Sequence, residues 1–378
     1  MTTRKAMLGV LLVVTAACSS ASSDDDAGTT TTTVPVTYPG EAWAAADPAE
    51  AGFDPAGLAR LAHTAEAAGS SCLVVVRGGE VVAEEYWQGA GPDVAREAWS
   101  VTKSVTSTLV GIARDEGRLE LIDPAADHIP AWQGTPAEAV TVEDLLSNDS
   151  GRHWDLATDY VEMAMGANDK TAFAVGLAQA DPPGEVWAYN NSAIQTLSPV
   201  LASATGEDPV DFARSRLFEP LGMDHSTLST DGAGNAMTYA GLQTTCLDLA
   251  RFGHLMLHDG RWAGEQVVSA DYVEQATGRP STPLNAAYGL LWWVNHEGPI
   301  AGPLLATTGV ADATVDEGRL VPAAPDDAFW AMGMHNQIVA VLPSVDVVAV
   351  RLGGRPPDDA PFTQTELTTG VLDALVAP

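Results

Sequence analysis

The sequence predicts an α+β fold, in which an antiparallel sheet is formed from both ends of the chain and flanked by helices. Near the N-terminus, the β-rich runs 73–77 and 80–87 are separated by Gly78-Gly79, a pair typical of a tight hairpin turn. Three more β-rich runs lie near the C-terminus, at 328–334, 337–342 and 345–352. The chain between these two groups shows mostly helical patterns, so we expect a helical region inserted into the sheet at about residues 118–290.

Hydrophobic periodicity predicts three further helices. They cover residues 100–115, 247–258 and 365–376. Gly117 lies where the C-terminal cap of the first helix is expected. Two segments, 151–170 and 295–327, are instead rich in Gly, Pro, Ala and Asp. Long irregular segments in compact domains often form lids or binding loops, so both segments are candidates for that role.

The N-terminus indicates export. Arg4 and Lys5 precede an apolar run that is too short to span a bilayer, which predicts a signal peptide over residues 1–17. Cys18 follows two small residues in a pattern that resembles a bacterial lipobox. The resemblance implies that Cys18 is lipidated and holds the protein on the outer face of the cytoplasmic membrane. Ordinary secretion without lipidation is the alternative.

The composition divides the chain after the signal peptide into a tether and one folded domain. Residues 18–40 are mostly Ser, Asp and Thr, which bury too little apolar surface to offset chain entropy. We therefore expect a disordered tether, followed by a folded domain over 41–378. The net charge of −32, from 18 basic and 50 acidic residues, excludes nucleic acid and anionic lipid headgroups as partners. Membrane contact is accordingly expected through the lipid anchor only.

Patterns of several other functional classes are missing. The sequence has no Gly-x-Ser-x-Gly motif, which excludes the simplest α/β-hydrolase site. His254 and His258 have helical spacing, but no Glu follows His254 as in zinc proteases, so we expect no metal site there. Cys72 and Cys246 match no metal-binding spacing. An oxidising compartment permits a disulfide between them without requiring one, and we expect two buried thiols.

The candidate chemistry is carried by Ser100-Val101-Thr102-Lys103. Helical positions i and i+3 share a face, so the Lys103 amine can reach the Ser100 hydroxyl. A serine needs an adjacent base to become nucleophilic, and a lysine can serve if burial and the positive end of a helix lower its pKa. Because Ser100 begins its helix, its backbone N–H is also free to stabilise an oxyanion.

Lysine usage favours a functional role for Lys103. Lys5, Lys103 and Lys170 are the only lysines, and Lys5 leaves with the signal peptide. The chain otherwise takes its positive charge from arginine, which does not deprotonate in proteins and cannot act as a base. A solvated lysine on a helix surface is the simpler alternative.

Ser-x-x-Lys at the start of a helix, followed by Tyr189-Asn190-Asn191, resembles the penicillin-recognising serine hydrolases. It looks most like the branch with class C β-lactamases, D-alanyl-D-alanine peptidases, related esterases and 6-aminohexanoate-dimer hydrolases. Supporting segments occur in the same order at 144–147, 150–151, 182–185, 220–223, 241–253 and 288–293. The resemblance spans about residues 42–377 and implies a β-lactamase/transpeptidase-like fold.

The resemblance also implies roles for residues far from Ser100. Tyr189 would pass a proton to the leaving group and later activate water, and a cationic Lys103 would make its phenol easier to deprotonate. Core packing is the alternative for Tyr189. Asn191 would hydrogen-bond Lys103 or a substrate amide. Several tryptophans near the motif segments are candidates for an apolar acyl pocket: Trp99, Trp154, Trp187, Trp292 and Trp330.

The third motif of the family, Lys-Thr-Gly, is absent because no lysine follows Lys170. The corresponding strand is Gly333–Gln337, where His335 would replace the lysine and Asn336 stands in place of a glycine. His335 and Gln337 are candidate substrate-binding residues, although His335 also fits a polar strand-edge position. We expect backbone N–H groups of Ser100 and of 335–338 to hold the oxyanion. The altered motif argues against efficient β-lactamase or D-alanyl-D-alanine peptidase activity.

These observations predict a serine hydrolase that acts on a small-molecule ester or amide through Ser100, Lys103 and Tyr189, with Asn191 beside the substrate. No metal or organic cofactor is implied, and the oligomeric state stays open. A β-lactamase or D-alanyl-D-alanine peptidase is one alternative. A non-catalytic ligand-binding protein on the same fold is another.

Overall fold

The structure is a computed structural model that describes residues 36–308 and 315–376. The predicted signal peptide over 1–17, the lipidation site Cys18 and most of the predicted tether lie outside the described residues. Within the described part of the chain, no helix is both long and apolar enough to cross a membrane.

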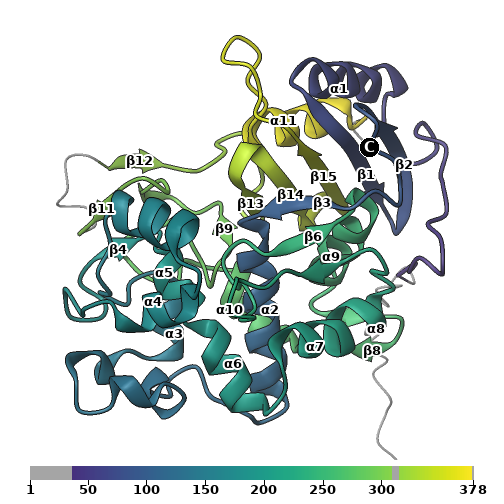
Figure 1. Cartoon of the computed structure of the whole chain (residues 1–378). Helices are drawn as coiled ribbons and strands as arrows, with labels where there is room; N and C mark the ends of the chain where they lie inside the picture. The colour runs from purple at the N-terminus through teal and green to yellow at the C-terminus, as the bar shows by residue number, and fades with distance from the viewer. Residues whose placement is uncertain (1–35, 309–314, 377–378) are drawn as a thin grey trace, which may run out of the picture. The chain divides into compact units, whose positions relative to one another are not determined.

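A six-stranded antiparallel sheet lies at the centre of the domain and confirms the predicted fold class. Its strands are β1 (Ser70–Arg77), β2 (Glu80–Tyr86), β9 (Trp293–Val294), β13 (Phe329–Gly333), β14 (Gln337–Leu342) and β15 (Val347–Gly353). Their order across the sheet is β2-β1-β15-β14-β13-β9. The antiparallel pairing of β1 with β15, with Val74 opposite Val350, joins the two ends of the chain (Figure 1).

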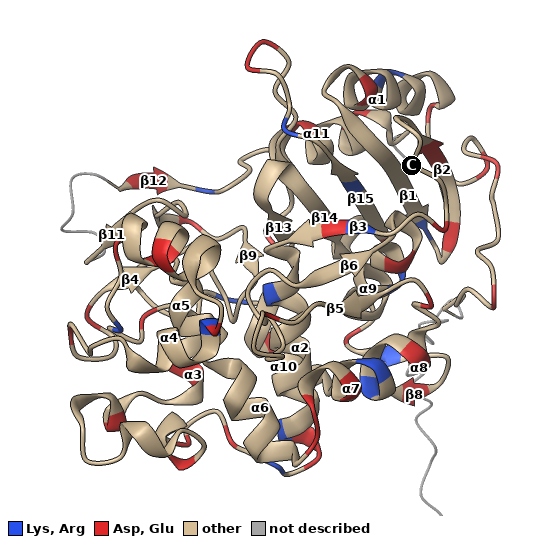
Figure 2. Cartoon of the chain, in the orientation of Figure 1, with Lys and Arg blue, Asp and Glu red and all other residues tan. Residues whose placement is uncertain are grey.

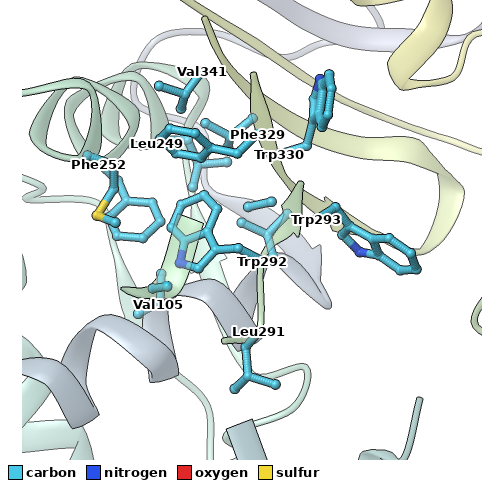
Figure 3. Close-up of a cluster of buried hydrophobic side chains, with 14 of the residues drawn as sticks. Val105, Leu249, Phe252, Leu291, Trp292, Trp293, Phe329, Trp330 and Val341 are labelled. Carbon is cyan, nitrogen blue, oxygen red and sulfur yellow. The ribbon is translucent and has the colours of Figure 1, made fainter. Parts of the chain in front are cut away.

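Two helical layers cover the sheet. Their main helices are α1 (Pro55–Ala67), α2 (Val101–Asp115), α9 (Cys246–Leu257) and α11 (Gln364–Ala374). Successive side chains of β13 point to opposite faces. Trp330 donates to Thr368 of α11 at 3.0 Å. Phe329 contacts Trp292, which stacks on Phe252 of α9 (Figure 3). Helices α11 and α1 thus lie on one face, and α9 and α2 on the other.

The region inserted between β3 (Arg96–Trp99) and β9 is mostly helical, as expected. Besides α2 and α9, its α-helices are α3 (Val142–Ser147), α4 (Lys170–Gly176), α5 (Asn191–Gln195), α6 (Leu197–Thr205), α7 (Pro209–Ala213), α8 (Glu219–Leu221) and α10 (Ala270–Thr277). Ala157–Gly166 and Arg214–Phe218 are π-helical. Short strands form small additional sheets. Strand β6 (Leu242–Thr244) pairs with β3 on one side and with β5 (Thr227–Leu228) on the other. The other pairs are β4 (Trp187–Ala188) with β11 (Ala306–Thr307), β7 (Arg261–Trp262) with β8 (Glu265–Gln266), and β10 (Gly298–Ile300) with β12 (Asp316–Gly318).

The domain begins before residue 41, where the composition had placed its boundary. His254 Nε2 donates to the Thr37 carbonyl at 2.9 Å, and Arg251 Nη2 donates to the Gly40 carbonyl at 2.8 Å. Residues 36–40 therefore pack on helix α9. They were assigned to the tether together with the Ser-, Asp- and Thr-rich residues that precede them. The contacts are made by backbone carbonyls and by the ring of Tyr38, which lies against His254, His258 and Trp262.

Cys72 and Cys246 form a disulfide, which corrects the expectation of two buried thiols. Their Cα atoms lie 6.4 Å apart, although 174 positions separate them in the sequence. The bond joins strand β1 to the first residue of α9. The prediction failed because only the packing of α9 on the sheet brings the two cysteines together.

Candidate active site

Ser100 lies at the turn between strand β3 and helix α2. Trp99, the last residue of β3, has a φ of 50°, which bends the chain sharply before the helix. Thr102 Oγ1 donates to the Trp99 carbonyl at 2.5 Å and accepts from the Leu242 N–H of β6 at 2.9 Å. The turn is therefore held by β6 as well as by the helix, and Ser100 begins α2 as its N-cap residue, as predicted.

Lys103 is enclosed beside Ser100 and is only 1% exposed. Its Nζ donates to Ser100 Oγ at 2.9 Å, to Asn191 Oδ1 at 2.6 Å and to the Tyr239 carbonyl at 2.9 Å. Burial lowers the pKa of Lys103 to about 7, and the nearby Asp159 carboxylate opposes this shift only in part. A substantial fraction of Lys103 is therefore neutral at neutral pH and able to accept a proton.

Tyr189 lies directly over the lysine, with Lys103 Nζ 4.6 Å from the centroid of its ring. Its hydroxyl hydrogen-bonds Ser100. Burial raises the pKa of Tyr189 well above its ordinary value, and the hydrogen bond with Ser100 opposes this only in part. The raised pKa keeps the Tyr189 phenol protonated at neutral pH. The expectation that a cationic Lys103 eases its deprotonation stays a prediction.

Asp159 positions the residues around Lys103, although no sequence motif points to it. Its carboxylate accepts from Asn191 Nδ2 at 2.7 Å and from Ser192 Oγ at 2.8 Å, and also from both of their backbone N–H groups. These bonds turn the Asn191 amide so that its oxygen faces Lys103. The only hint was that Asp159 lies in the 151–170 segment, a candidate binding loop.

The turn between β13 and β14 lies against Ser100. A Cβ atom on Gly333 would collide with the Ala98 carbonyl and lie 3.1 Å from the Ser100 nitrogen. Residues 334–336 form a tight 3₁₀ turn, with His335 and Asn336 at φ values of 63° and 60°. The expected strand over 335–338 is thus corrected to a turn followed by β14. The backbone beside the Ser100 nitrogen belongs to Gly333.

The two candidate residues of this motif have different positions. His335 lines the cavity at Ser100, and its ring lies 6.0 Å from the ring of Trp99. Gln337 is buried and does not line the cavity. Its Nε2 donates to the Met334 and Gly353 carbonyls at 3.0 and 2.8 Å, and its Oε1 accepts from the Gly353 N–H at 2.8 Å. These bonds tie Gln337 to the turn and to β15 instead of directing it at a substrate.

A cavity of about 430 Å³ opens onto Ser100 and Tyr189. The segments 151–170 and 295–327, which were predicted as lids or binding loops, both contribute to its wall. Tyr160 comes from the first segment and Pro303 from the second, and the Tyr160 hydroxyl donates to the Pro303 carbonyl at 3.5 Å. The two irregular segments therefore meet at the cavity.

The tryptophan at the cavity is Trp293, which was not among the five candidates. It lines the cavity and stacks on Tyr189, with ring centroids 5.9 Å apart. Trp187, Trp292 and Trp330 are instead fully buried in the core, and Figure 3 shows Trp292 and Trp293 pointing in different directions. Trp292 precedes strand β9 and enters the core, whereas Trp293, the first residue of β9, lines the cavity.

A serine at a helix N-terminus, bonded to a buried lysine of lowered pKa and to a tyrosine hydroxyl, has the features of an activated nucleophile. With this fold, the arrangement defines the class of serine hydrolases. The chain belongs to the β-lactamase family, whose family model matches residues 31–367.

Individual relatives agree with this assignment. The chain is 26% identical to the 6-aminohexanoate-dimer hydrolase of Paenarthrobacter ureafaciens over 321 residues, which cover 77% of this chain and 74% of the relative. A Bacillus anthracis protein provisionally assigned as a 6-aminohexanoate-dimer hydrolase superposes with a TM-score of 0.67 at 20% identity, covering 83% of this chain and 80% of that one. A D-alanine carboxypeptidase of Burkholderia cenocepacia superposes with a TM-score of 0.59 at 21% identity, covering 85% and 97%. The two structures show the shared fold.

Proposed function

We propose that the protein hydrolyses a small ester or amide through an acyl-enzyme formed on Ser100. The observation that carries this proposal is the 2.9 Å contact between Lys103 Nζ and Ser100 Oγ, in surroundings that lower the Lys103 pKa to about 7. A base of this pKa is half neutral near pH 7, which is close to the optimum for general-base catalysis at that pH.

The proposed steps use side chains of this chain alone. Neutral Lys103 takes the hydroxyl proton as Ser100 Oγ attacks the substrate carbonyl carbon. The backbone N–H groups of Ser100 and of 333–334 hold the oxyanion. Tyr189 donates its proton to the leaving oxygen or nitrogen and regains one from protonated Lys103. Water then attacks the acyl carbon, and the reverse proton transfers release the acid and restore the Ser100 hydroxyl.

An ester or amide without a carboxylate is favoured over a β-lactam or a D-alanyl-D-alanine peptide. The sequence has no lysine after Lys170, so the turn at Gly333–Gln337 lacks the cation that would pair with a substrate carboxylate. His335 is the nearest substitute in that turn. β-Lactamase and peptidase activities therefore remain the alternatives against which the proposal is tested.

The test is intact-mass spectrometry after incubation with a fluorophosphonate, together with hydrolysis of p-nitrophenyl butyrate. We expect one adduct on the wild-type protein and none on Ser100→Ala, with labelling of Lys103→Ala slowed at least about a hundredfold. Lys170→Ala is the matched control, because Lys170 Nζ donates to the Ala167 carbonyl and lies outside the site. It is expected to label at the wild-type rate.

Two results would reject the proposal. Ester hydrolysis that survives Ser100→Ala would place the chemistry elsewhere, and a folded protein that forms no adduct would favour the non-catalytic alternative. Labelling of Ser100 by a fluorescent penicillin, at a rate comparable to the fluorophosphonate, would instead support a β-lactamase or peptidase.

A further inference from the structure

The cavity at Ser100 is lined mainly by apolar side chains. Its apolar wall is formed by Trp293, Ile300, Leu304, Leu320, Met332, Met334 and Ile338. Among the described residues that line the cavity, none is Asp, Glu, Lys or Arg, and His335 also lines it. A carboxylate placed against the apolar wall would lose hydration without an ammonium or guanidinium partner from the lining residues, which makes its binding costly.

Two residues of the cavity wall, Leu304 and Met334, are themselves exposed, and further exposed apolar side chains lie on the two irregular segments that contribute to the wall. We call these six residues the apolar rim: Leu156, Val161, Met165, Leu304, Leu305 and Met334. Met165 is 80% exposed and Leu304 is 60% exposed. Isolated exposed apolar residues are normal, but a group of them beside a functional cavity indicates a binding surface.

The 157–166 segment connects part of the rim to the cavity. It is a π-helix that carries Val161 and Met165, and its Tyr160 lines the cavity. The Tyr160 hydroxyl contacts the Pro303 carbonyl, which precedes Leu304 and Leu305. The two segments that carry most of the rim therefore meet at the cavity wall, and Met334 belongs to the turn beside Ser100.

We propose that the substrates are neutral esters or amides with a long apolar acyl chain, which fills the cavity and continues over the apolar rim. This inference rests on the proposed function, because it takes Ser100 as the acylated residue. The net charge of −32 adds to the selection, since it disfavours the approach of anionic substrates. Leu304 and Met334 belong both to the cavity wall and to the rim. We therefore assign the rim to the substrate's own acyl chain and not to a separate partner.

The test compares kcat/KM for p-nitrophenyl acetate, butyrate, octanoate and decanoate, each below its aggregation concentration. Each methylene removed from water favours binding by roughly threefold to fourfold, so decanoate is expected to exceed acetate by at least about tenfold. The p-nitrophenyl monoester of succinate has the same number of acyl carbons as butyrate, with a carboxylate in place of the terminal methyl group. It is expected to react at least roughly tenfold more slowly than butyrate.

Substitutions in the apolar rim test whether the rim causes the preference for long acyl chains. Met165→Gln combined with Leu304→Gln is expected to lower the decanoate-to-acetate ratio by at least about fivefold. Ile122→Gln is the matched control, because Ile122 is 75% exposed but does not line the cavity. It is expected to leave the ratio at the wild-type value.

The outcomes separate this inference from the proposed function. Ser100-dependent hydrolysis of acetate with no preference for longer chains would overturn the inference and leave the function intact. A chain-length preference that the rim variant does not change would overturn the role of the rim. Failure of every ester, together with no adduct on Ser100, would reject the proposed function and this inference with it.

Discussion

Lys103 is held where its proton is easily lost. Its Nζ has three hydrogen-bond acceptors around it, Ser100 Oγ, Asn191 Oδ1 and the Tyr239 carbonyl, all neutral groups. The opposing charge that acts on it, Asp159, accepts four hydrogen bonds from Asn191 and Ser192, which stabilise the carboxylate in place. Burial therefore outweighs the attraction of the carboxylate, and the ammonium form loses the stabilisation it has in water.

The pH profile of kcat/KM follows from this environment. Only neutral Lys103 can take the Ser100 proton, and its pKa is about 7, so activity is expected to rise through pH 7 and level off above it. Lys103→Arg is expected to lose roughly a thousandfold or more at every pH, because a guanidinium does not deprotonate. Initial rates on p-nitrophenyl acetate between pH 5.5 and pH 9 measure both effects.

A second variant, Asp159→Asn, is measured over the same pH range of kcat/KM. The Asp159 carboxylate raises the Lys103 pKa, so its removal is expected to move the midpoint of the profile to lower pH. A midpoint that stays in place, or substantial activity in Lys103→Arg, would contradict the assignment of Lys103 as the base.

Elements from distant parts of the sequence hold Ser100 at its turn. Strand β6 accepts and donates along β3, with Leu242 paired to Trp99, and β13 approaches so closely that only a glycine fits at 333. Helix α9 follows β6 directly, and its first residue, Cys246, is bonded to Cys72 of β1. The disulfide therefore connects the central sheet to the segment that carries Tyr239 and Leu242.

Loss of the disulfide is expected to lower the stability of the fold. A cross-link between residues 174 positions apart restricts the unfolded chain strongly, so Cys72→Ala with Cys246→Ala is expected to lower the free energy of unfolding by about 3–5 kcal/mol. Thermal unfolding with and without reductant measures the effect. The double variant is also the control for the reductant, because its Tm is expected to be the same with and without it. A double variant with the same Tm as the oxidised wild-type protein would contradict the prediction.

The whole molecule is strongly acidic. Figure 2 shows Asp and Glu in many helices and loops, with few Lys and Arg among them, so the charge is not gathered into one site. Such a surface repels anionic headgroups. We therefore propose that the protein is exported and held at the membrane by a lipid on Cys18, with residues 36–40 packed on α9 as the start of the domain.

Lipidation is tested on the full chain expressed in a bacterial host. The wild-type protein is expected to partition into the detergent phase of a cloud-point separation, and Cys18→Ser into the aqueous phase, because an acyl anchor supplies the only strong apolar attachment in this proposal. Intact mass of the purified protein measures the lipid directly. Equal partitioning of the two proteins would favour ordinary secretion.

The local sequence was sufficient for the features that depend on neighbouring residues. The β-rich runs became β1, β2, β13, β14 and β15 with bounds that differ by at most three residues, since alternation and turn residues are local signals. Ser100 and Lys103 were found for the same reason: three positions on one helix put the two side chains on one face. The motif order also placed the chain in its family.

Tertiary structure decided everything that depends on burial or on contacts between distant segments. Packing against Asn191 and the Tyr239 carbonyl, 88 and 136 positions away, makes Lys103 a buried base. Burial also raises the pKa of Tyr189, which only the folded surroundings of its ring explain. Asp159, Trp293 and the disulfide were missed because spacing along the chain carries no signal for groups that meet only when the sheet, the helices and the irregular segments close around one cavity.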